Sequence, residues 1–150
     1  MYIFVDKKTT MRSDITFTMI KPDAVAEGNA GAILKMIEAA DFKILAMKLT
    51  HLSLEQAAKF YEVHKGKPFY EDLCEYMSSG KIVAMVLSKR DAVKEYRQLI
   101  GATDPSKAET GTIRKLYAKS IQSNAVHGSD SDENAQIEAN FFFSGLEYFE

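Results

Sequence analysis

The sequence has almost no cysteine. Cys74 is the single one among 150 residues, so no disulfide can form within the chain. A chain without disulfides is typical of a reducing compartment. Cys74 lies in an apolar pattern with helical spacing, which favours a buried structural thiol over a reactive one.

Long apolar runs and an excess of one charge are also missing. No run reaches the roughly 20 residues that a transmembrane helix needs, and the apolar patch at residues 2–5 is too short for a signal-peptide core. We therefore expect a cytoplasmic protein with no membrane partner. The formal net charge is −2, which argues against a general electrostatic attraction to nucleic acid. An anion site must come from local clustering of lysine and arginine.

Glycine-rich phosphate loops are absent as well. The sequence contains neither a G-x-x-x-x-G-K-[ST] loop nor a G-x-G-x-x-G turn. A protein of this sequence that handles phosphate must therefore use cationic side chains, and Lys21, Arg97 and Arg114 are the candidates. Arginine binds phosphate oxygens with a planar, bidentate group, and lysine with a compact charge. Each one alone is more often a solvated surface charge, so this hypothesis depends on their occurring together with a reactive group.

The length suits one domain with a substantial core. Hydrophobic periodicity, capping residues and turn residues predict its elements in order. These are a strand over 14–20, a helix around 30–37, a strand over 42–52, a helix after the capping box of Ser53 and Gln56, a helix over 69–77, a strand over 82–87, a helix over 91–100 ending at Gly101, a loop over 102–111, an ambiguous segment over 112–120, a strand over 124–127, and a helix that begins after Asp130 or Ser131.

This order contains two β-α-β units and an extra helix pair. It predicts an α+β protein with a ferredoxin-like βαββαβ domain, in which a four-stranded antiparallel sheet is covered by helices on one face. A doubly wound parallel sheet is the competing arrangement. We expect residues 13–150 to form this domain and residues 1–12 to be an N-terminal extension or tag.

The most informative stretch is N-A-V-H-G-S-D-S at residues 124–131. A histidine that acts as a nucleophile needs a fixed ring, a backbone that lets substrate approach, and polar neighbours that orient it. His127 has a glycine, two hydroxyls and a carboxylate directly after it. The alternative is a turn histidine before a capped helix.

Two further motifs stand in a fixed order before this stretch, K-P-D at residues 21–23 and G-T-I-R at residues 111–114. With these motifs, the sequence over residues 14–150 resembles the nucleoside diphosphate kinase family. The resemblance implies an enzyme that transfers the γ-phosphoryl group of ATP to nucleoside diphosphates through a phosphohistidine at His127. Asp104 departs from the pattern, because asparagine is common there, but no catalytic group is lost.

The resemblance also implies roles for individual residues. His127 is the nucleophile, Ser129 and Glu138 hold its ring, and Tyr61 packs beside it. Glu138 lies on the apolar stripe of the last predicted helix, where a buried carboxylate needs a partner. The implied nucleotide contacts are Lys21 for phosphate and ribose, Phe69, Leu73 and Ile121 for the base, Arg97, Thr103 and Arg114 for the phosphates, and Asn124 for the ribose 3′-hydroxyl. His51 and His64 match no catalytic position, so we interpret them as surface or packing residues.

The implied cofactor is Mg²⁺, carried by the nucleotide phosphates rather than by a cage of protein side chains. Stacking on Phe69 predicts weak discrimination among bases, because every base has a π-face. The family forms homo-oligomers, either tetramers or hexamers, that are assembled from dimers. The loop around Pro105 is a contact loop between the subunits of the family. Two alternatives are a catalytically silent nucleotide-binding scaffold of the same fold and a nucleic-acid-binding module.

Overall fold

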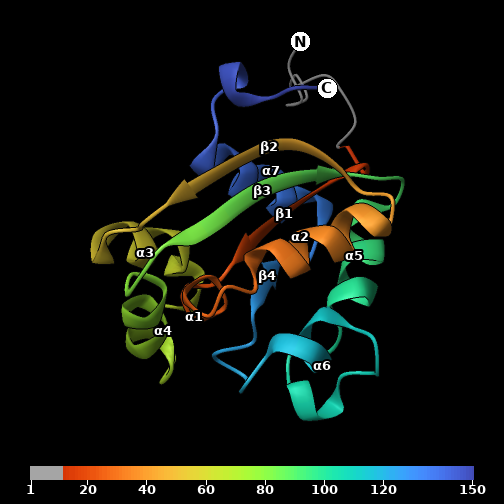
Figure 1. Ribbon diagram of the computed structural model, residues 1–150. Coiled ribbons are helices and arrows are strands. Elements are labelled where there is room, and N and C mark those ends of the chain that lie inside the picture. The colour runs from red at the N-terminus through yellow and green to blue at the C-terminus, as the bar shows by residue number, and fades with distance from the viewer. Residues whose placement is uncertain (1–11) are drawn as a thin grey trace.

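A four-stranded antiparallel sheet forms the centre of the computed structural model, which describes residues 12–150 (Figure 1). Its strands are β1 (Ile15–Ile20), β2 (Lys43–Thr50), β3 (Ile82–Ser88) and β4 (Val126–Gly128), in the spatial order β2-β3-β1-β4. All neighbouring strands are antiparallel, which confirms the predicted α+β, ferredoxin-like class and excludes the doubly wound alternative. Residues 1–11, most of the predicted extension, lie outside the described residues.

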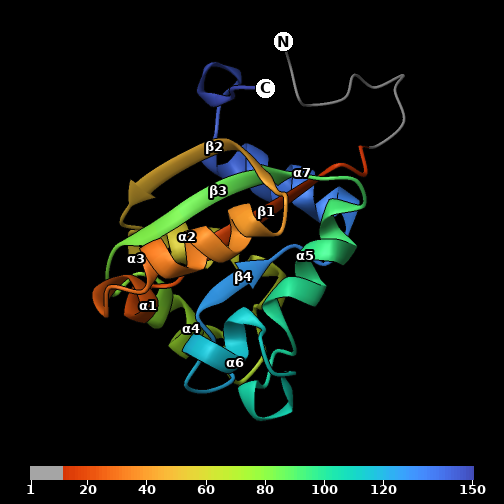
Figure 2. The same ribbon diagram turned by 45° about the vertical axis from the view of Figure 1, so that its right-hand side comes forward.

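Helices cover both faces of this sheet, so the prediction of helices on one face is wrong. The helices are α1 (Pro22–Ala26), α2 (Ala30–Ala39), α3 (Leu54–Phe60), α4 (Tyr70–Met77), α5 (Ala92–Ile100), α6 (Ile113–Tyr117) and α7 (Asp132–Phe142). Figures 1 and 2 show α2 and α5 on one side of the sheet and α7 on the other. All six residues of β1 are buried, as expected for a strand covered on both faces.

The two faces have separate hydrophobic cores. Phe17 and Met19 of β1 pack with residues of α3, α4 and α7, whereas Ile20 packs with residues of α2 and α5. Alternate side chains of a strand point to opposite faces, which explains why β1 contributes to both cores. Cys74 belongs to the first core and is buried, as predicted.

Local sequence accounts for several of the helix ends. The capping box is present, with Ser53 Oγ accepting the N–H of Gln56 and the Gln56 side chain accepting the N–H of Ser53. Gly101 ends α5 with a φ of 87°, a conformation that favours glycine. The ambiguous segment contains α6, which Thr112 caps. The short helix α1 was not predicted from the sequence, although Pro22 and Asp23 are typical of a first helical turn.

Strand pairing and short segments bring distant motifs together. His127 on β4 pairs with Met19 on β1, and Lys21 follows directly after β1. Three 3₁₀ segments, Glu62–His64, Pro105–Lys107 and Gly145–Glu147, lie in the connections. None of the helices in residues 12–150 has the length and apolar character needed to span a membrane.

Candidate active site

His127 is held by its backbone and by one ring nitrogen. Its carbonyl accepts a hydrogen bond from Thr18 Oγ1 at 2.6 Å. Its Nε2 lies 2.9 Å from Glu138 Oε1, and both side chains are only 18% exposed. A carboxylate can only accept hydrogen bonds, so Nε2 carries the proton and Nδ1 carries the lone pair. Nδ1 has no hydrogen-bond partner among residues 12–150 and is therefore the nitrogen available for chemistry.

Ser129 fixes the carboxylate behind this ring. Its Oγ donates to Glu138 Oε1 at 2.7 Å and accepts the backbone N–H of Phe17 at 3.0 Å. The Ser129 backbone N–H donates to the carbonyl of Phe17 at 3.2 Å. The backbone of Phe17 on β1 thus positions Ser129, Ser129 positions Glu138, and Glu138 orients the histidine. This arrangement fixes both the tautomer and the direction of the ring.

Aromatic rings surround the histidine ring. The ring centroids of Phe60, Phe17 and Tyr61 lie 5.6, 6.0 and 6.4 Å from that of His127. The Tyr61 hydroxyl is buried and has no hydrogen-bond partner among the described residues, and burial, with a further contribution from Glu138, raises its pKa. Rigid packing of this kind keeps a catalytic group in one rotamer.

The backbone around the histidine is tight. Ala125 has a φ of 74°, and the Val126 N–H donates to the Asn124 carbonyl at 2.9 Å. This is a strained three-residue γ-turn. A Cβ at Gly128, after the histidine, would lie 2.9 Å from Ile100 Cδ1 and 3.3 Å from Tyr96 Cδ2, so these side chains would have to shift. Glycine at this position therefore allows β4 to pack closely against α5.

The histidine opens onto a cavity of about 410 Å³. The predicted site residues that line it are Lys21, Tyr61, Phe69, Leu73, Thr103, Ile121, Asn124 and His127. Phe69 and Ile121 are 48% and 60% exposed, so a flat ligand can reach both. The lining combines apolar side chains with a lysine, an asparagine and a histidine, which suits a ligand with an aromatic ring and an anionic tail.

Lys21 is buried in this cavity without a carboxylate partner. Its Nζ donates to Asn124 Oδ1 at 2.7 Å, and Asn124 Nδ2 in turn donates to the Thr103 carbonyl at 3.3 Å. Burial first, and repulsion by Arg114 second, lower the pKa of Lys21 to about 7. A bound anion would reverse this effect, because it favours the charged form of lysine.

Arg114 is buried against backbone carbonyls. Its Nε, Nη1 and Nη2 donate to the carbonyls of Asn124, Gly101 and Val126 at 3.3, 3.0 and 2.9 Å. Burial lowers its pKa to about 10. Two of these bonds tie α6 to the turn before the histidine, and the third ties α6 to Gly101 at the end of α5. They leave two of the five guanidinium N–H groups for a ligand.

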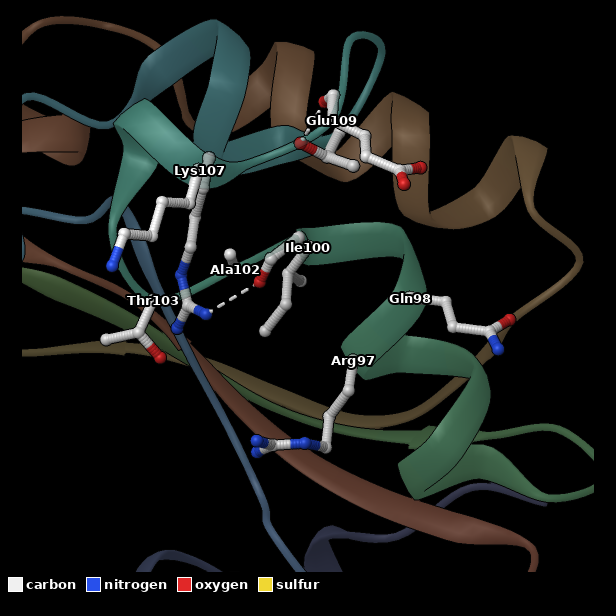
Figure 3. A pocket seen from close by; sticks show the side chains of 10 residues that line it. Arg97, Gln98, Ile100, Ala102, Thr103, Lys107 and Glu109 are labelled. Carbon is white, nitrogen blue, oxygen red and sulfur yellow. Dashed lines mark hydrogen bonds between the residues drawn. The ribbon is translucent and has the colours of Figure 1, made fainter.

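A second cavity of about 710 Å³ adjoins the first and shares Thr103 with it. Arg97 and Arg114, the remaining predicted phosphate ligands, line this cavity together with Lys107. In Figure 3 the side chains of Arg97 and Lys107 extend toward the side where Thr103 lies, whereas Gln98 and Glu109 point away. The two cavities together form one cleft. We call the part with Phe69, Leu73 and Ile121 its apolar end, and the part with Arg97, Lys107 and Arg114 its cationic end.

Positive charge in this cleft is not balanced by the protein. Among residues 12–150, no carboxylate lies within ion-pair distance of Lys21, Arg97, Lys107 or Arg114. In the same residues, no group of three or more His, Cys, Asp or Glu side chains is placed to hold a metal ion. Lys21 and Arg114 are buried, and a buried cation without a carboxylate partner is costly, so the cleft suits an anionic ligand.

Several residues that line the cleft were not predicted as site residues, and His64, Gln122 and Lys107 are three of them. His64 was interpreted as a surface or packing residue, but it lines the first cavity and lies between Tyr61 and Phe69, with ring centroids 6.4 and 5.3 Å away. Gln122 lines the first cavity and Lys107 the second. Their proximity to predicted residues in the chain was the only available indication. His51 is exposed and bonds to the Ser78 carbonyl, as expected for a surface residue.

Comparison with known proteins agrees with this geometry. The sequence model described as nucleoside diphosphate kinase matches residues 14–148. The chain is 58% identical over 139 residues to a nucleoside diphosphate kinase of Flavobacterium psychrophilum, covering 93% of this chain and 100% of that protein. It belongs to the nucleoside diphosphate kinase family.

Solved structures of family members have the same fold. The nucleoside diphosphate kinase of Aquifex aeolicus superposes with a TM-score of 0.88 at 42% identity, covering 91% of this chain and 99% of that one. The enzyme of Halobacterium salinarum, solved in complex with CDP, gives 0.88 at 35% identity, covering 93% of each chain. As a nucleoside diphosphate kinase, the protein transfers the γ-phosphoryl group of a nucleoside triphosphate to nucleoside diphosphates.

Proposed function

We propose that Nδ1 of His127 is the atom that carries the phosphoryl group. The observation that supports this most strongly is the 2.9 Å contact between His127 Nε2 and Glu138 Oε1, because it leaves the lone pair on Nδ1. In the first half-reaction Nδ1 forms a bond to the γ-phosphorus of ATP. The bond from that phosphorus to the bridging oxygen breaks, and ADP leaves with the electron pair.

In the second half-reaction a terminal phosphate oxygen of the acceptor diphosphate attacks the same phosphorus. The bond between phosphorus and Nδ1 breaks, and the ring returns to its neutral form with the proton still on Nε2. Glu138 stabilises the positive charge that develops on the ring when Nδ1 is phosphorylated, and Ser129 holds that carboxylate in place.

The cationic end of the cleft is proposed to bind the phosphates. Arg97 and Arg114 would contact the β- and γ-phosphates, with the Thr103 hydroxyl beside them. Lys21 would contact phosphate from the other side, and its bond to Asn124 places it next to the proposed ligand of the ribose 3′-hydroxyl. Phosphoryl transfer requires mainly such positioning and neutralisation of charge.

The apolar end is proposed to bind the base. Phe69 offers an exposed ring for stacking, and Leu73 and Ile121 flank it. The Halobacterium salinarum relative was solved with CDP, and we infer a similar nucleotide site here. Since stacking is tolerant of base identity, we expect a broad range of nucleotides as substrates.

We propose Mg²⁺ as the cofactor, bound to the nucleotide phosphates. The residues of the cleft are compatible with an ion carried in this way. The cleft offers Lys21, Arg97 and Arg114, and the described residues contain no set of converging carboxylates there. This suits a cation that is held by phosphate oxygens and water. When bound, the ion supplies neutralisation of phosphate charge.

A homo-oligomer is also proposed. β2 is an edge strand of the sheet, and Met47 and Leu49 on it are 52% and 61% exposed. Exposed apolar side chains on an edge strand are typical of a surface that another chain covers. The choice between tetramer and hexamer, the cytoplasmic location and the domain boundary at residue 13 stay predictions.

The proposal is tested by incubation with γ-labelled ATP and Mg²⁺, followed by a chase with unlabelled GDP. We expect label on the protein that is labile to acid, stable to alkali, absent in His127→Ala, and transferred to GTP in the chase. Tight nucleotide binding without any label would contradict the proposal and favour the catalytically silent scaffold.

A further inference from the structure

A short loop over residues 119–123 forms one wall of the apolar end of the cleft. The loop closes on itself, because the Lys119 N–H donates to the Ser123 carbonyl at 2.9 Å and the Ser123 N–H donates to Ser120 Oγ at 2.9 Å. Its apolar side chain, Ile121, lines the cavity. The opposite wall is Leu73 on α4 and Phe69 directly before α4.

These two walls come from segments that are far apart in the sequence. Gln122 forms a polar link between them, because its side-chain Nε2 donates to the carbonyl of Asp72 at 3.0 Å. A second link is the side-chain hydrogen bond between Ser123 of the loop and Tyr76 on α4. Gln122 lies next to Ile121, and Asp72 lies next to Leu73. We call the space between Leu73 and Ile121, where the base is proposed to bind, the base slot. The Gln122 hydrogen bond therefore joins the two walls directly beside this slot.

The loop has a second side-chain anchor on its other side. Lys119 forms an ion pair with Glu27, at the end of α1. Neither Lys119 nor Glu27 lines the cavity. The loop also receives a contact from Lys21 Nζ at the Gln122 carbonyl, at 3.5 Å. Among its own side chains, Gln122 is an anchor across the base slot and Lys119 is an anchor away from it, so Lys119 supplies a matched control.

We propose that Gln122 is a positioning residue that sets the spacing of the base slot. It fixes Ile121 opposite Leu73, so that a base stacked on Phe69 meets a preformed gap rather than two mobile walls. A preformed site avoids the entropy cost of ordering the loop when the nucleotide binds. This proposal rests on the proposed base slot and extends it to a residue outside the catalytic groups.

The experiment compares acceptors with and without a base, using protein already phosphorylated by ATP and freed of nucleotide. Dephosphorylation is followed with ADP, CDP and ribose 5-diphosphate, which lacks a base. For Gln122→Ala we expect the KM for ADP and CDP to rise about three- to tenfold, the effect of losing about one net hydrogen bond. The kcat and the use of ribose 5-diphosphate stay at the wild-type values.

Other variants separate positioning from folding. Gln122→Glu has the same size but no donor for the Asp72 carbonyl, so it behaves like Gln122→Ala. Gln122→Arg keeps a donor of sufficient length and restores the low KM. Lys119→Ala breaks the other anchor and leaves the KM for ADP unchanged. An equal loss with ribose 5-diphosphate, or an equal rise in KM for Lys119→Ala, would overturn the proposal.

Phe69→Ala tests the proposed base-binding site separately from the proposed role of Gln122. We expect Phe69→Ala to raise the KM for ADP and CDP alike, more than tenfold on stacking grounds. If Phe69→Ala has that effect and Gln122→Ala has none, only the role of Gln122 is wrong. If neither variant affects the KM for ADP, the proposed base slot is wrong.

Discussion

The two sides of the catalytic histidine are built differently. Behind the ring, Glu138, Ser129 and the backbone of Phe17 satisfy one another through hydrogen bonds of 2.7–3.0 Å. In front of it, Lys21 and Arg114 are buried but have no carboxylate partner among the described residues. The hydrogen bonds behind the ring are complete without a ligand, and we propose that the phosphates of the substrate supply the missing negative charge in front of it.

This difference separates two tasks in the enzyme. The rear holds the nucleophile in one tautomer and orientation at all times, which is electrostatic preorganisation. The front keeps unbalanced positive charge in a partly dehydrated cleft, where attraction to phosphate is stronger than in water. Variants of the rear should therefore affect the chemical step, and variants of the front should affect nucleotide binding.

The largest effect is expected for His127→Ala. Without Nδ1 no phosphoenzyme can form, so transfer from ATP to GDP should fall to background while nucleotide binding and the unfolding midpoint stay close to wild type. Label transfer and thermal unfolding measure the two properties. His51→Ala is the matched control, because His51 is exposed and remote from the cleft; turnover by His127→Ala like that of the control would contradict the assignment.

Glu138→Gln should lower kcat about 100-fold, within the range of general acid–base effects. The amide can donate to Nε2, which would shift the proton to Nδ1 and remove the lone pair. The KM for ADP should change little, because Glu138 lies behind the ring. Steady-state kinetics with ATP and GDP give both constants, and a change confined to KM would show that Glu138 belongs to the nucleotide site instead.

The two arginines should separate binding from stability. Arg97 is exposed and has no partner among the described residues, so Arg97→Ala should weaken ADP binding about tenfold with no change in the free energy of unfolding. Arg114→Ala should weaken binding and also cost about 3 kcal/mol of stability, because two buried carbonyls and one half-buried carbonyl lose their donor.

Calorimetric titration with ADP and denaturant unfolding measure these two quantities for each arginine variant. Equal stability of Arg97→Ala and Arg114→Ala would show that the buried hydrogen bonds of Arg114 contribute little.

The smallest effect at neutral pH is a pH dependence from Lys21, which grows as the pH rises above 7. Its pKa of about 7 in the free protein lies well below 10.5, and bound phosphates favour the charged form. Above pH 7 the protein must take up a proton when it binds ADP, so affinity should fall by up to about tenfold per pH unit. Titrations at pH 6–9 in buffers of different ionisation enthalpy measure this uptake, and Lys21→Met should abolish it.

The same group affects stability with the opposite sign. Between pH 7 and 10.5 the folded, nucleotide-free protein binds fewer protons at Lys21 than the unfolded chain. The contribution of Lys21 to the free energy of unfolding therefore rises with pH over this window. Denaturant unfolding of wild type and Lys21→Met at several pH values measures the difference.

Local patterns predicted most elements but not how they pack. The capping box at Ser53, the end of α5 at Gly101 and the buried strand β3 were all predicted from short windows. The short helix α1 was missed, and β4 begins two residues later than predicted, at Val126. The arrangement of helices on both faces was missed because periodicity within a helix does not say which face of the sheet it covers.

The sequence by itself determined the family and the order of the motifs, because these are fixed by residue types at given spacings, and it predicted His127 as the nucleophile. Only the tertiary structure decided which ring nitrogen of His127 is free, that Arg114 is committed to three carbonyls, and that His64 and Gln122 join the cleft. These features depend on contacts between residues far apart in the chain, such as Gln122 and Asp72. Such contacts form only when strands and helices pack, and no local pattern contains them.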